Sequence, residues 1–382
     1  MWAVGGEHFT ARLTGVTAAW QVTYLDANGK QQTVPAAELA WWGTCVEPTR
    51  GSLVVLADGG LVPADVTAAD KDNLTAESDL LGTLKLPLES LAGVVFHLPA
   101  DRHDRDLLVD RIARAAGETD RVLLDNGDEV TGLVESLAGG KIEIKADVGP
   151  IGIETRRCVA LVLNPALRQK PTPAGFSAWV GLSDGGRMLA ARLTVGETAA
   201  QWTTPAGQTF KTASKELVFL QPLGGRSQYL SDLQPVEYRH VPYLDLPWPY
   251  HADRNVTGGM LRCGGRLCLK GLGVHSGAHL TYALDGSAQV FHVELGIDDS
   301  TGGGGSVEFH ILVDGDLRYV GEAVRGGAPP VSREINVAGA KRLELEVVYG
   351  ERGDVLDRAD WLNARLVRWP LEKREWRARR TP

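Results

Sequence analysis

Apolar and polar positions alternate in short runs along most of this chain, and glycine-containing turns separate the runs. Three stretches place an apolar run directly before an Asp-Gly or Asn-Gly turn, at residues 52–60, 120–128 and 177–186. Alternation with a period of two between such turns is typical of β-strands joined as hairpins. The pattern therefore predicts an all-β protein.

The three stretches are parts of a longer internal repeat. After each turn come two more strand-like runs, a short turn and a last apolar strand, at 86–99, 153–165 and 211–224. Residues 11–43 align with 191–224 and show the same ending without its beginning. Units of about 45–50 residues have room for roughly five short strands each. We therefore expect tandem small β-barrel repeats, which loosely resemble Sm-like or SH3-like barrels in their pattern.

A single helix interrupts the repeats. From Asp101 to Ala116 the apolar residues Leu107, Leu108, Ile112 and Ala115 recur at helical spacing, with acids near the start and arginines later. This segment is predicted to be a packed connector between two repeats. The expected organisation is a partial barrel repeat at 1–50, barrel repeats at 51–100, 120–168 and 176–225, the connecting helix at 101–119, a linker at 226–242, a β-sandwich at 243–369 and a basic tail at 370–382.

The pattern changes at Tyr243, where a proline- and aromatic-rich lead-in begins. Short alternating strands follow, with turns about every ten residues, as in a β-sandwich. Residues 307–313 place Val307, Phe309, Ile311 and Val313 on one face, and Asp314-Gly315 then turns the chain back. Residues 342–347 repeat the alternation, with leucine and valine on one face and glutamate on the other.

Composition and charge exclude some functions. The 382 residues are 43% hydrophobic and 23% charged, as in globular proteins, and the net charge is -8. A general nucleic-acid binder needs a basic face, so nucleic acid is not expected as a partner. The basic run at 373–380 is the exception and is expected to be a solvated tail. No apolar run of 18 residues exists, so no transmembrane segment is expected. No signal peptide is visible at the start, so either the protein stays inside the cell or a leader was trimmed.

Four segments in the C-terminal third resemble one known family. They are "KGLGVHSGAHLTYALDG" (270–286), "LGIDDSTGGGGSVEFHILVDG" (295–315), "VAGAKRLELEV" (337–347) and "GDVLDRADWLNARL" (353–366). In this order they resemble the NPCBM family, which is similar to the family 51 carbohydrate-binding modules found beside glycoside hydrolases, over residues 243–369. The resemblance implies a galactose-binding-like jelly-roll β-sandwich without catalytic activity that recognises terminal sugars. It also implies a structural calcium ion and an extracellular or cell-envelope location.

The glycine-rich stretch at 296–315 leaves two interpretations open. Its glycines run into a strand and follow two carboxylates, so a phosphate-binding loop is disfavoured. Either the glycines only supply unusual backbone angles, or the loop helps to bind calcium, which prefers several oxygen ligands. Asp354, Asp357 and Asp360 form a second acidic group that could converge on the loop. The candidate metal ligands are Asp298, Asp299, Asp357 and Asp360; the alternative is that both acidic groups are solvated turns.

Sugar binding needs an apolar plate for the pyranose face and planar groups that hydrogen-bond to hydroxyls. Large aromatic residues are mostly buried, so a role in core packing is the alternative for each candidate. Trp361 is the candidate most expected to be structural, because it begins the last strand, and His275 could equally be a core histidine. The candidate carbohydrate-binding residues are Trp248, Tyr250, His251, His275, Arg325 and Trp361.

Three functions compete on these grounds. The leading hypothesis is a non-catalytic protein that binds a glycan or polysaccharide with galactose-like terminal sugars through its sandwich. The first alternative is a structural or assembly protein of the cell envelope, in which the sandwich and the N-terminal barrels bind protein partners. The second is a carbohydrate-active hydrolase, although no known catalytic motif is present in the repeats. Cys263 and Cys268 either pair across a hairpin or are two buried thiols.

Overall fold

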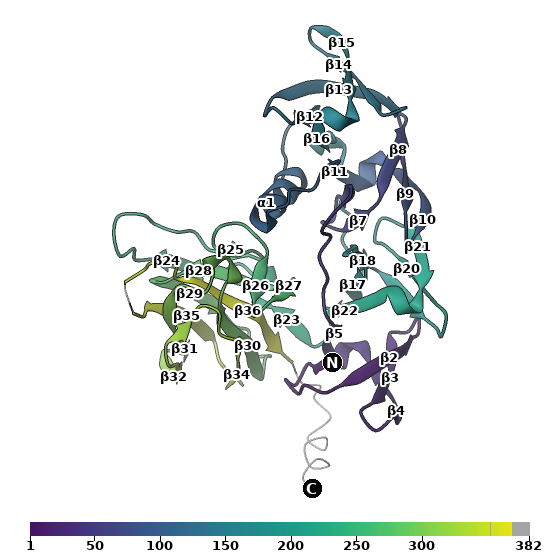
Figure 1. Ribbon diagram of the computed structural model, residues 1–382. Coiled ribbons are helices and arrows are strands. Elements are labelled where there is room, and N and C mark those ends of the chain that lie inside the picture. The colour runs from purple at the N-terminus through teal and green to yellow at the C-terminus, as the bar shows by residue number, and fades with distance from the viewer. Residues whose placement is uncertain (352, 369–382) are drawn as a thin grey trace. The chain divides into compact units, whose positions relative to one another are not determined.

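The computed structural model describes residues 1–351 and 353–368 of the chain (Figure 1). The chain divides into two compact units: unit 1 comprises Met1–Trp2 and His8–Leu223, and unit 2 comprises Ala3–Glu7 and Gly224–Pro382. Nearly all regular structure is β-strand, so the all-β prediction is confirmed. The predicted basic tail lies outside the described residues. Among the described residues, no helix has the length and apolar character needed to cross a membrane.

Unit 1 contains one strand order three times in full and once in part. We name the repeats R1 to R4 in chain order. In R2 and R4 a hairpin is followed by three more strands, a 3₁₀ turn and a last strand that pairs with the first, and R3 has two strands in place of the three. R1 has β2 (Ala11–Val16), β3 (Gln21–Asp26), β4 (Gln31–Pro35), η1 (Ala36–Glu38) and β5 (Leu39–Gly43), and β1 (Trp2–Ala3) pairs with β5. R2 has β6 (Leu53–Leu56), β7 (Leu61–Pro63), β8 (Asp65–Ala69), β9 (Asn73–Ser78), β10 (Gly82–Pro87), η2 (Leu88–Ser90) and β11 (Leu91–Val95).

The remaining two repeats follow the same order. R3 has β12 (Asp120–Leu124), β13 (Glu129–Ala138), β14 (Lys141–Ala146), β15 (Gly149–Glu154), η3 (Thr155–Arg157) and β16 (Cys158–Val162), followed by η4 (Pro165–Leu167). R4 has β17 (Ser177–Leu182), β18 (Arg187–Ala190), β19 (Arg192–Val195), β20 (Ala199–Thr203), β21 (Thr209–Ala213), η5 (Ser214–Glu216) and β22 (Leu217–Leu223). The long β13 pairs with β12 through its first half and with β14 through its second, and so corresponds to β7 and β8 together.

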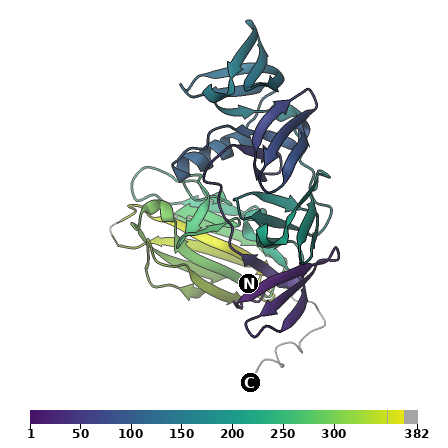
Figure 2. The ribbon, with the colours of Figure 1, turned by 45° about the vertical axis from the view of Figure 1, so that its right-hand side comes forward.

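The repeats are joined edge to edge instead of forming separate barrels. Strand β11 pairs with β6 on one edge and with β16 of the next repeat on the other, and β22 likewise pairs with both β17 and β5. The pairing of β18 with β7 links R4 to R2, so the repeats follow one another in space in the order R1, R4, R2, R3 (Figure 2). No closed ring of paired strands forms in the part of the chain that the structure describes. The physical reason is that β11, β22 and β18 each have an edge that finds its hydrogen-bond partner in a neighbouring repeat.

The connecting helix is α1 (Arg102–Ala113), which begins one residue after the predicted start and ends three residues before the predicted end. The Asp101 carboxylate caps it by accepting hydrogen bonds from the backbone N–H groups of His103 and Asp104. Val109 and Ile112 are buried beside β6 and β11, as expected for a packed connector. Leu107, which was expected on the packed face, is instead 40% exposed.

Unit 2 is a sandwich of two six-stranded sheets. The first sheet has the order β25 (His251–Ala252), β28 (Gly271–His275), β36 (Arg358–Val367), β30 (Val290–Ile297) and β34 (Val331–Asn336), with β23 (Ser227–Tyr229) beside β36. The second has β24 (Glu237–His240), β29 (Ala278–Ala283), β35 (Arg342–Tyr349), β31 (Ser306–Val313) and β32 (Asp316–Val320), with β33 (Val324–Arg325) beside β31. A separate hairpin joins β26 (Leu261–Cys263) and β27 (Arg266–Cys268), and two 3₁₀ turns are η6 (Leu230–Asp232) and η7 (Asp299–Thr301).

The core of unit 2 lies between the two sheets, and the predicted alternation places it. The apolar residues of β31 that the alternation placed on one face are all buried, and Leu343, Leu345 and Val347 of β35 pack against them.

The prediction of a linker at 226–242 is wrong, because these residues form β23 and β24, one in each sheet. Strands of three and four residues are too short for an alternating pattern to reveal. All four cysteines are free and buried, so Cys263 and Cys268 are two thiols in a small apolar cluster.

Candidate functional site

A proline-rich segment crosses from one sheet of the sandwich to the other and carries the best-placed candidate residue. Residues 241–250 connect β24 of one sheet to β25 of the other. Three hydrogen bonds hold the segment: the Tyr349 hydroxyl donates to the Val241 carbonyl, the Tyr238 hydroxyl donates to the Trp248 carbonyl, and the Trp248 backbone N–H donates to Nδ1 of His240 at 3.1 Å. Trp248 is therefore fixed through its backbone, while its side chain stays half-buried.

The indole ring of Trp248 stacks on the imidazole of His275 at the end of β28. The ring centroids lie 5.0 Å apart and the planes are inclined by only 5°. The ring of His240 meets His275 edge-on, with centroids 6.1 Å apart. Among the described residues, no group accepts a hydrogen bond from the indole N–H of Trp248. One face of the indole is thus covered by protein, and its N–H remains available to a ligand.

Both histidines are held in the neutral form. Desolvation by burial lowers the pKa of His240 and of His275, and the nearby charge of Asp354 only partly offsets that effect. Nε2 of His240 lies 2.9 Å from the Ser276 carbonyl, so Nε2 carries the proton and Nδ1 accepts from Trp248. We call Trp248, His275, His240 and Asp354 the Trp248 surface. It offers the half-buried indole of Trp248 as a stacking plate and the carboxylate of Asp354, while His275, which is 5% exposed, backs the indole.

The other sugar candidates do not join this surface. Trp361 is fully buried in the sandwich core and meets Phe309 edge-to-face with centroids 4.9 Å apart, so its assignment to sugar binding is wrong. Tyr250 packs beside Tyr238 at the margin of the core. His251 lies in β25 opposite Gly273. Arg325 is exposed on β33, where its guanidinium donates to Glu351 at 2.6 Å.

The sequence analysis missed His240 and Asp354 as members of the surface. His240 precedes the proline-rich lead-in, and only the pairing of β24 with β29 brings it beside His275. The one available signal was its closeness in sequence to Trp248. Asp354 was noted in the acidic group at 354–360 and considered only in connection with calcium.

The four candidate metal ligands do not converge. In the residues from 1 to 351 and from 353 to 368, no three acidic, histidine or cysteine side chains form a metal-binding group. Asp299 accepts the backbone N–H groups of Gly264 and Gly265, and Asp357 accepts that of Ser306. Only Asp298 and Asp360 meet, deep in unit 2. Calcium usually takes six to eight oxygen ligands, which this pair alone does not supply.

Comparison with known proteins supports the resemblance found in the sequence. Residues 226–367 match the family model of the NPCBM/NEW2 domain, and this match confirms the resemblance for that part of the chain. It begins at β23, so the matched segment includes the residues that had been expected to form a linker.

Three relatives are similar to parts of the chain. A protein of Renibacterium salmoninarum named "Putative endo-alpha-N-acetylgalactosaminidase" is 26% identical over 272 residues, which cover 58% of this chain and 18% of that protein. A family 51 module with INT domains from Clostridium perfringens ZmpB, in complex with GlcNAc, is 24% identical, covers 44% of this chain and 36% of its own, and has a TM-score of 0.35. The family 51 module of Clostridium perfringens GH95, in complex with methyl-galactose, is 22% identical, covers 37% of this chain and 99% of its own, and has a TM-score of 0.34. Both TM-scores are too low to establish a fold or a ligand.

Proposed function

We propose that unit 2, which contains the NPCBM/NEW2 domain, binds the terminal sugar of a glycan at the Trp248 surface, and that this sugar is a galactose-like hexose. The observation that carries the proposal is the geometry of Trp248. Its backbone is pinned at both the N–H and the carbonyl, its ring is backed by His275, and its indole N–H has no partner among the described residues. A rigid aromatic plate with a free donor is suited to the apolar face and the hydroxyls of a pyranose.

The neutral state of the two histidines supports an uncharged ligand. His275 is 5% exposed and both ring nitrogens of His240 already have partners, so these rings carry no charge that a ligand would have to desolvate. The Asp354 carboxylate next to these rings can accept hydrogen bonds from sugar hydroxyls. The surface therefore combines apolar contact with a hydrogen-bond donor and an acceptor. A ligand needs no charge of its own to use these groups.

The proposed role is binding without catalysis. Glycoside hydrolysis generally uses two carboxyl groups, about 5–10 Å apart, on either side of the scissile bond. The two candidate carboxyls that meet in unit 2, Asp298 and Asp360, are 1% and 0% exposed, so a substrate cannot reach them. A glycan partner would place the protein outside the cell or in the cell envelope.

The test uses the intact chain on a glycan array, followed by titration calorimetry with the monosaccharides that the array selects. We expect dissociation constants of about 1 mM to 1 μM, because one sugar buries little surface. Trp248→Ala should weaken binding at least tenfold while the melting temperature stays nearly unchanged, since the side chain is only half-buried. Tyr319→Ala, which removes a half-buried aromatic residue from strand β32 of the same unit, is the matched control and should bind normally.

Two outcomes would contradict the proposal. If Trp248→Ala unfolds unit 2, the indole is a core residue and the site lies elsewhere. If the intact, folded chain binds no glycan on a broad array, sugar recognition is absent and the assembly-protein hypothesis replaces it.

A further inference from the structure

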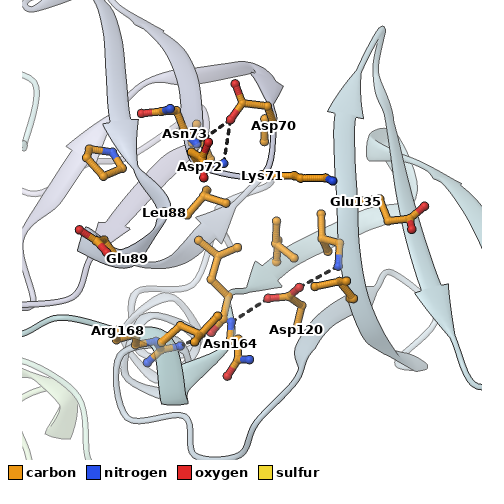
Figure 3. A pocket seen from close by; sticks show the side chains of 18 of the residues that line it. Asp70, Lys71, Asp72, Asn73, Leu88, Glu89, Asp120, Glu135, Asn164 and Arg168 are labelled. Carbon is orange, nitrogen blue, oxygen red and sulfur yellow. Dashed lines mark hydrogen bonds between the residues drawn. The ribbon is translucent and has the colours of Figure 1, made fainter.

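Unit 1 contains a large cavity that the proposed sugar-binding function does not use. It lies between R2 and R3, has a volume of about 1220 Å³, and is drawn in Figure 3. Small-molecule sites usually measure about 300–1,000 Å³. The cavity therefore has room for an occupant larger than a monosaccharide. We call it the R2–R3 groove.

The floor of the groove is apolar and partly open to solvent. Leu88, Leu161 and Leu163 line it together with Leu133 of β13 and Leu167 of η4. Leu133 and Leu167 are 58% and 65% exposed, although large apolar side chains gain free energy by burial. The described lining residues include no tryptophan, tyrosine, phenylalanine or histidine, so the groove offers no plate for a sugar ring.

The rim of the groove is acidic. Five acidic and two basic residues line the groove. Asp70 and Asp72 lie on the turn between β8 and β9, Glu89 lies in η2 and Glu135 in β13, and all four are exposed. Figure 3 shows Asp70 and Asp72 at one end, with Glu89 and Glu135 on opposite sides. The backbone N–H groups of Asp72 and Asn73 lower the pKa of Asp70, which keeps this carboxylate ionised.

The basic residues do not balance this charge. The Arg168 guanidinium is used within the fold: it donates to the backbone carbonyls of Ile112 and Ala113 at the end of α1, and to those of Ala92 and Leu163. Lys71 is the remaining cation of the described lining. An occupant with several positive charges would therefore complement the rim.

The buried carboxylate of the groove does not create a focused site for one amine. Asp120 is 6% exposed, and its two oxygens accept the backbone N–H groups of Asn164 and Val134, each at 2.7 Å. Both of its oxygens are thus engaged in joining β13 to the segment after β16. The acids that face solvent are spread around the apolar floor, an arrangement that favours several cations spaced along one chain.

We propose that the R2–R3 groove binds a basic amphipathic peptide segment of a partner protein, with leucine-like side chains on the floor and lysine or arginine at the rim. Leucine side chains of the partner would cover the exposed Leu133 and Leu167. The positive charges would meet Asp70, Asp72, Glu89 and Glu135, which gives register and specificity. This activity is independent of the sugar site, because every lining residue belongs to unit 1.

The test measures fluorescence anisotropy of three labelled peptides added to the intact chain at constant salt. The first alternates leucine and lysine, the second replaces leucine by serine, and the third replaces lysine by glutamate. We expect the leucine–lysine peptide to bind at least tenfold more tightly than either of the others. A peptide that bound only through the net charge of the protein would not distinguish leucine from serine.

Variants then locate the binding. Leu133→Ser and Leu167→Ser each change an exposed side chain, so the fold should survive, and each should weaken binding of the leucine–lysine peptide about tenfold. Asp72→Asn combined with Glu135→Gln should do the same and should also reduce the salt dependence. Val148→Ser is the matched control, because Val148 is 88% exposed at the turn between β14 and β15 and lies outside the groove.

Three results would overturn the proposal. Binding by Leu133→Ser and Leu167→Ser at the wild-type level would place the peptide elsewhere. Equal binding of the leucine–glutamate peptide would remove the role of charge. A concentration-dependent dimer in sedimentation, lost in Leu133→Ser, would show that a second copy of this chain covers the groove instead.

Discussion

Asp360 is the acidic residue of unit 2 whose burial most needs an explanation. Among the described residues, no N–H or O–H group donates to either of its carboxyl oxygens. The carboxyl of Asp298 lies beside it and already accepts from the side-chain amide of Asn255 and from the backbone N–H groups of Arg262 and Ser300. Two carboxyls can bond to each other only if one carries a proton. Burial, and then the charge of Asp298, raise the pKa of Asp360 well above its ordinary value, so Asp360 holds that proton.

This protonation makes a specific pH dependence testable. An aspartate in the unfolded chain releases its proton near pH 4, whereas folded Asp360 keeps it to higher pH. Between those values the folded state binds one proton more, so the free energy of unfolding of unit 2 falls as pH rises, by up to about 1.4 kcal/mol per pH unit. Asp360→Asn keeps a donor to Asp298 and removes the titration. Relative to wild type, this variant should gain stability as pH rises from 4.5 to 8, measured by denaturant unfolding.

Asp316→Asn is the control for this pH dependence. The Asp316 side chain is 74% exposed, so this variant should show no change of stability with pH relative to wild type.

The Asp360→Asn variant also tests the calcium prediction. If a proton joins the carboxyls of Asp298 and Asp360, a chelator should leave the melting temperature of the wild-type protein unchanged. A chelator-induced decrease that Asp360→Asn abolishes, together with destabilisation by this variant at every pH, would show that a cation and not a proton joins the two carboxyls.

At the scale of elements, the glycine loop between β30 and β31 shows two separate uses of glycine. Gly303 has φ +91° and nothing within 4 Å of the position where a Cβ would stand, so it supplies only an unusual backbone angle. Gly305 has φ +87°, and a Cβ there would lie 2.2 Å from the carbonyl oxygen of Leu356. The loop thus both turns the chain and allows β31 to start close to the 353–357 segment. The sequence left open whether the glycines supply unusual backbone angles or help to bind calcium. The observed geometry accounts for these two glycines by the backbone and the close approach alone.

These two glycines form a matched pair for mutation. Gly303→Ala should cost about 1–2 kcal/mol, the usual penalty for a left-handed backbone at an L-residue. Gly305→Ala should cost a further 1–3 kcal/mol, because the methyl group also forces a close contact apart. Equilibrium denaturation of both variants measures the difference. Equal costs would mean that the backbone of Leu356 moves away freely and that the close approach is unimportant.

The success of sequence reasoning differed between elements for physical reasons. Alternation over eight residues placed the core side chains of β31, because only one face of that strand is buried. The same reasoning could not show that β11 pairs with two repeats at once, since all five of its residues are buried and no face is distinguished. The exposure of Leu107 on α1 could not be predicted either. Helical spacing shows which residues share a face of the helix, but not which other elements pack against that face.

The candidate site was harder to predict than the fold. Trp248 and His275 are 27 positions apart and were both selected for their side-chain chemistry, but their stacking depends on how residues 241–250 cross the sandwich. Trp361 has the same chemistry as Trp248 and lies in the core. Side-chain chemistry alone does not show which of these two tryptophans is available to a ligand. That depends on whether the residue lies in a core strand, as Trp361 does, or in an exposed connection, as Trp248 does.

At the scale of the whole molecule, the two proposed binding sites lie in units with separate cores. The main core of unit 1 uses residues between Met1 and Leu220, and that of unit 2 uses residues between Leu230 and Leu366. Because each unit buries its own apolar residues, each should unfold in its own cooperative transition.

Scanning calorimetry of the intact chain should therefore show two transitions, and each ligand should move only one. A ligand at 100 times its dissociation constant stabilises its own unit by about 2.7 kcal/mol, a shift that is easily measured. The selected monosaccharide should raise the transition of unit 2, and Trp248→Ala should abolish that shift. The leucine–lysine peptide should raise the transition of unit 1, and Leu133→Ser should abolish that one, so each variant is the control for the other ligand. A single transition that both ligands raise together would show that the two units unfold as one, because stabilisation of either unit would then stabilise the whole chain.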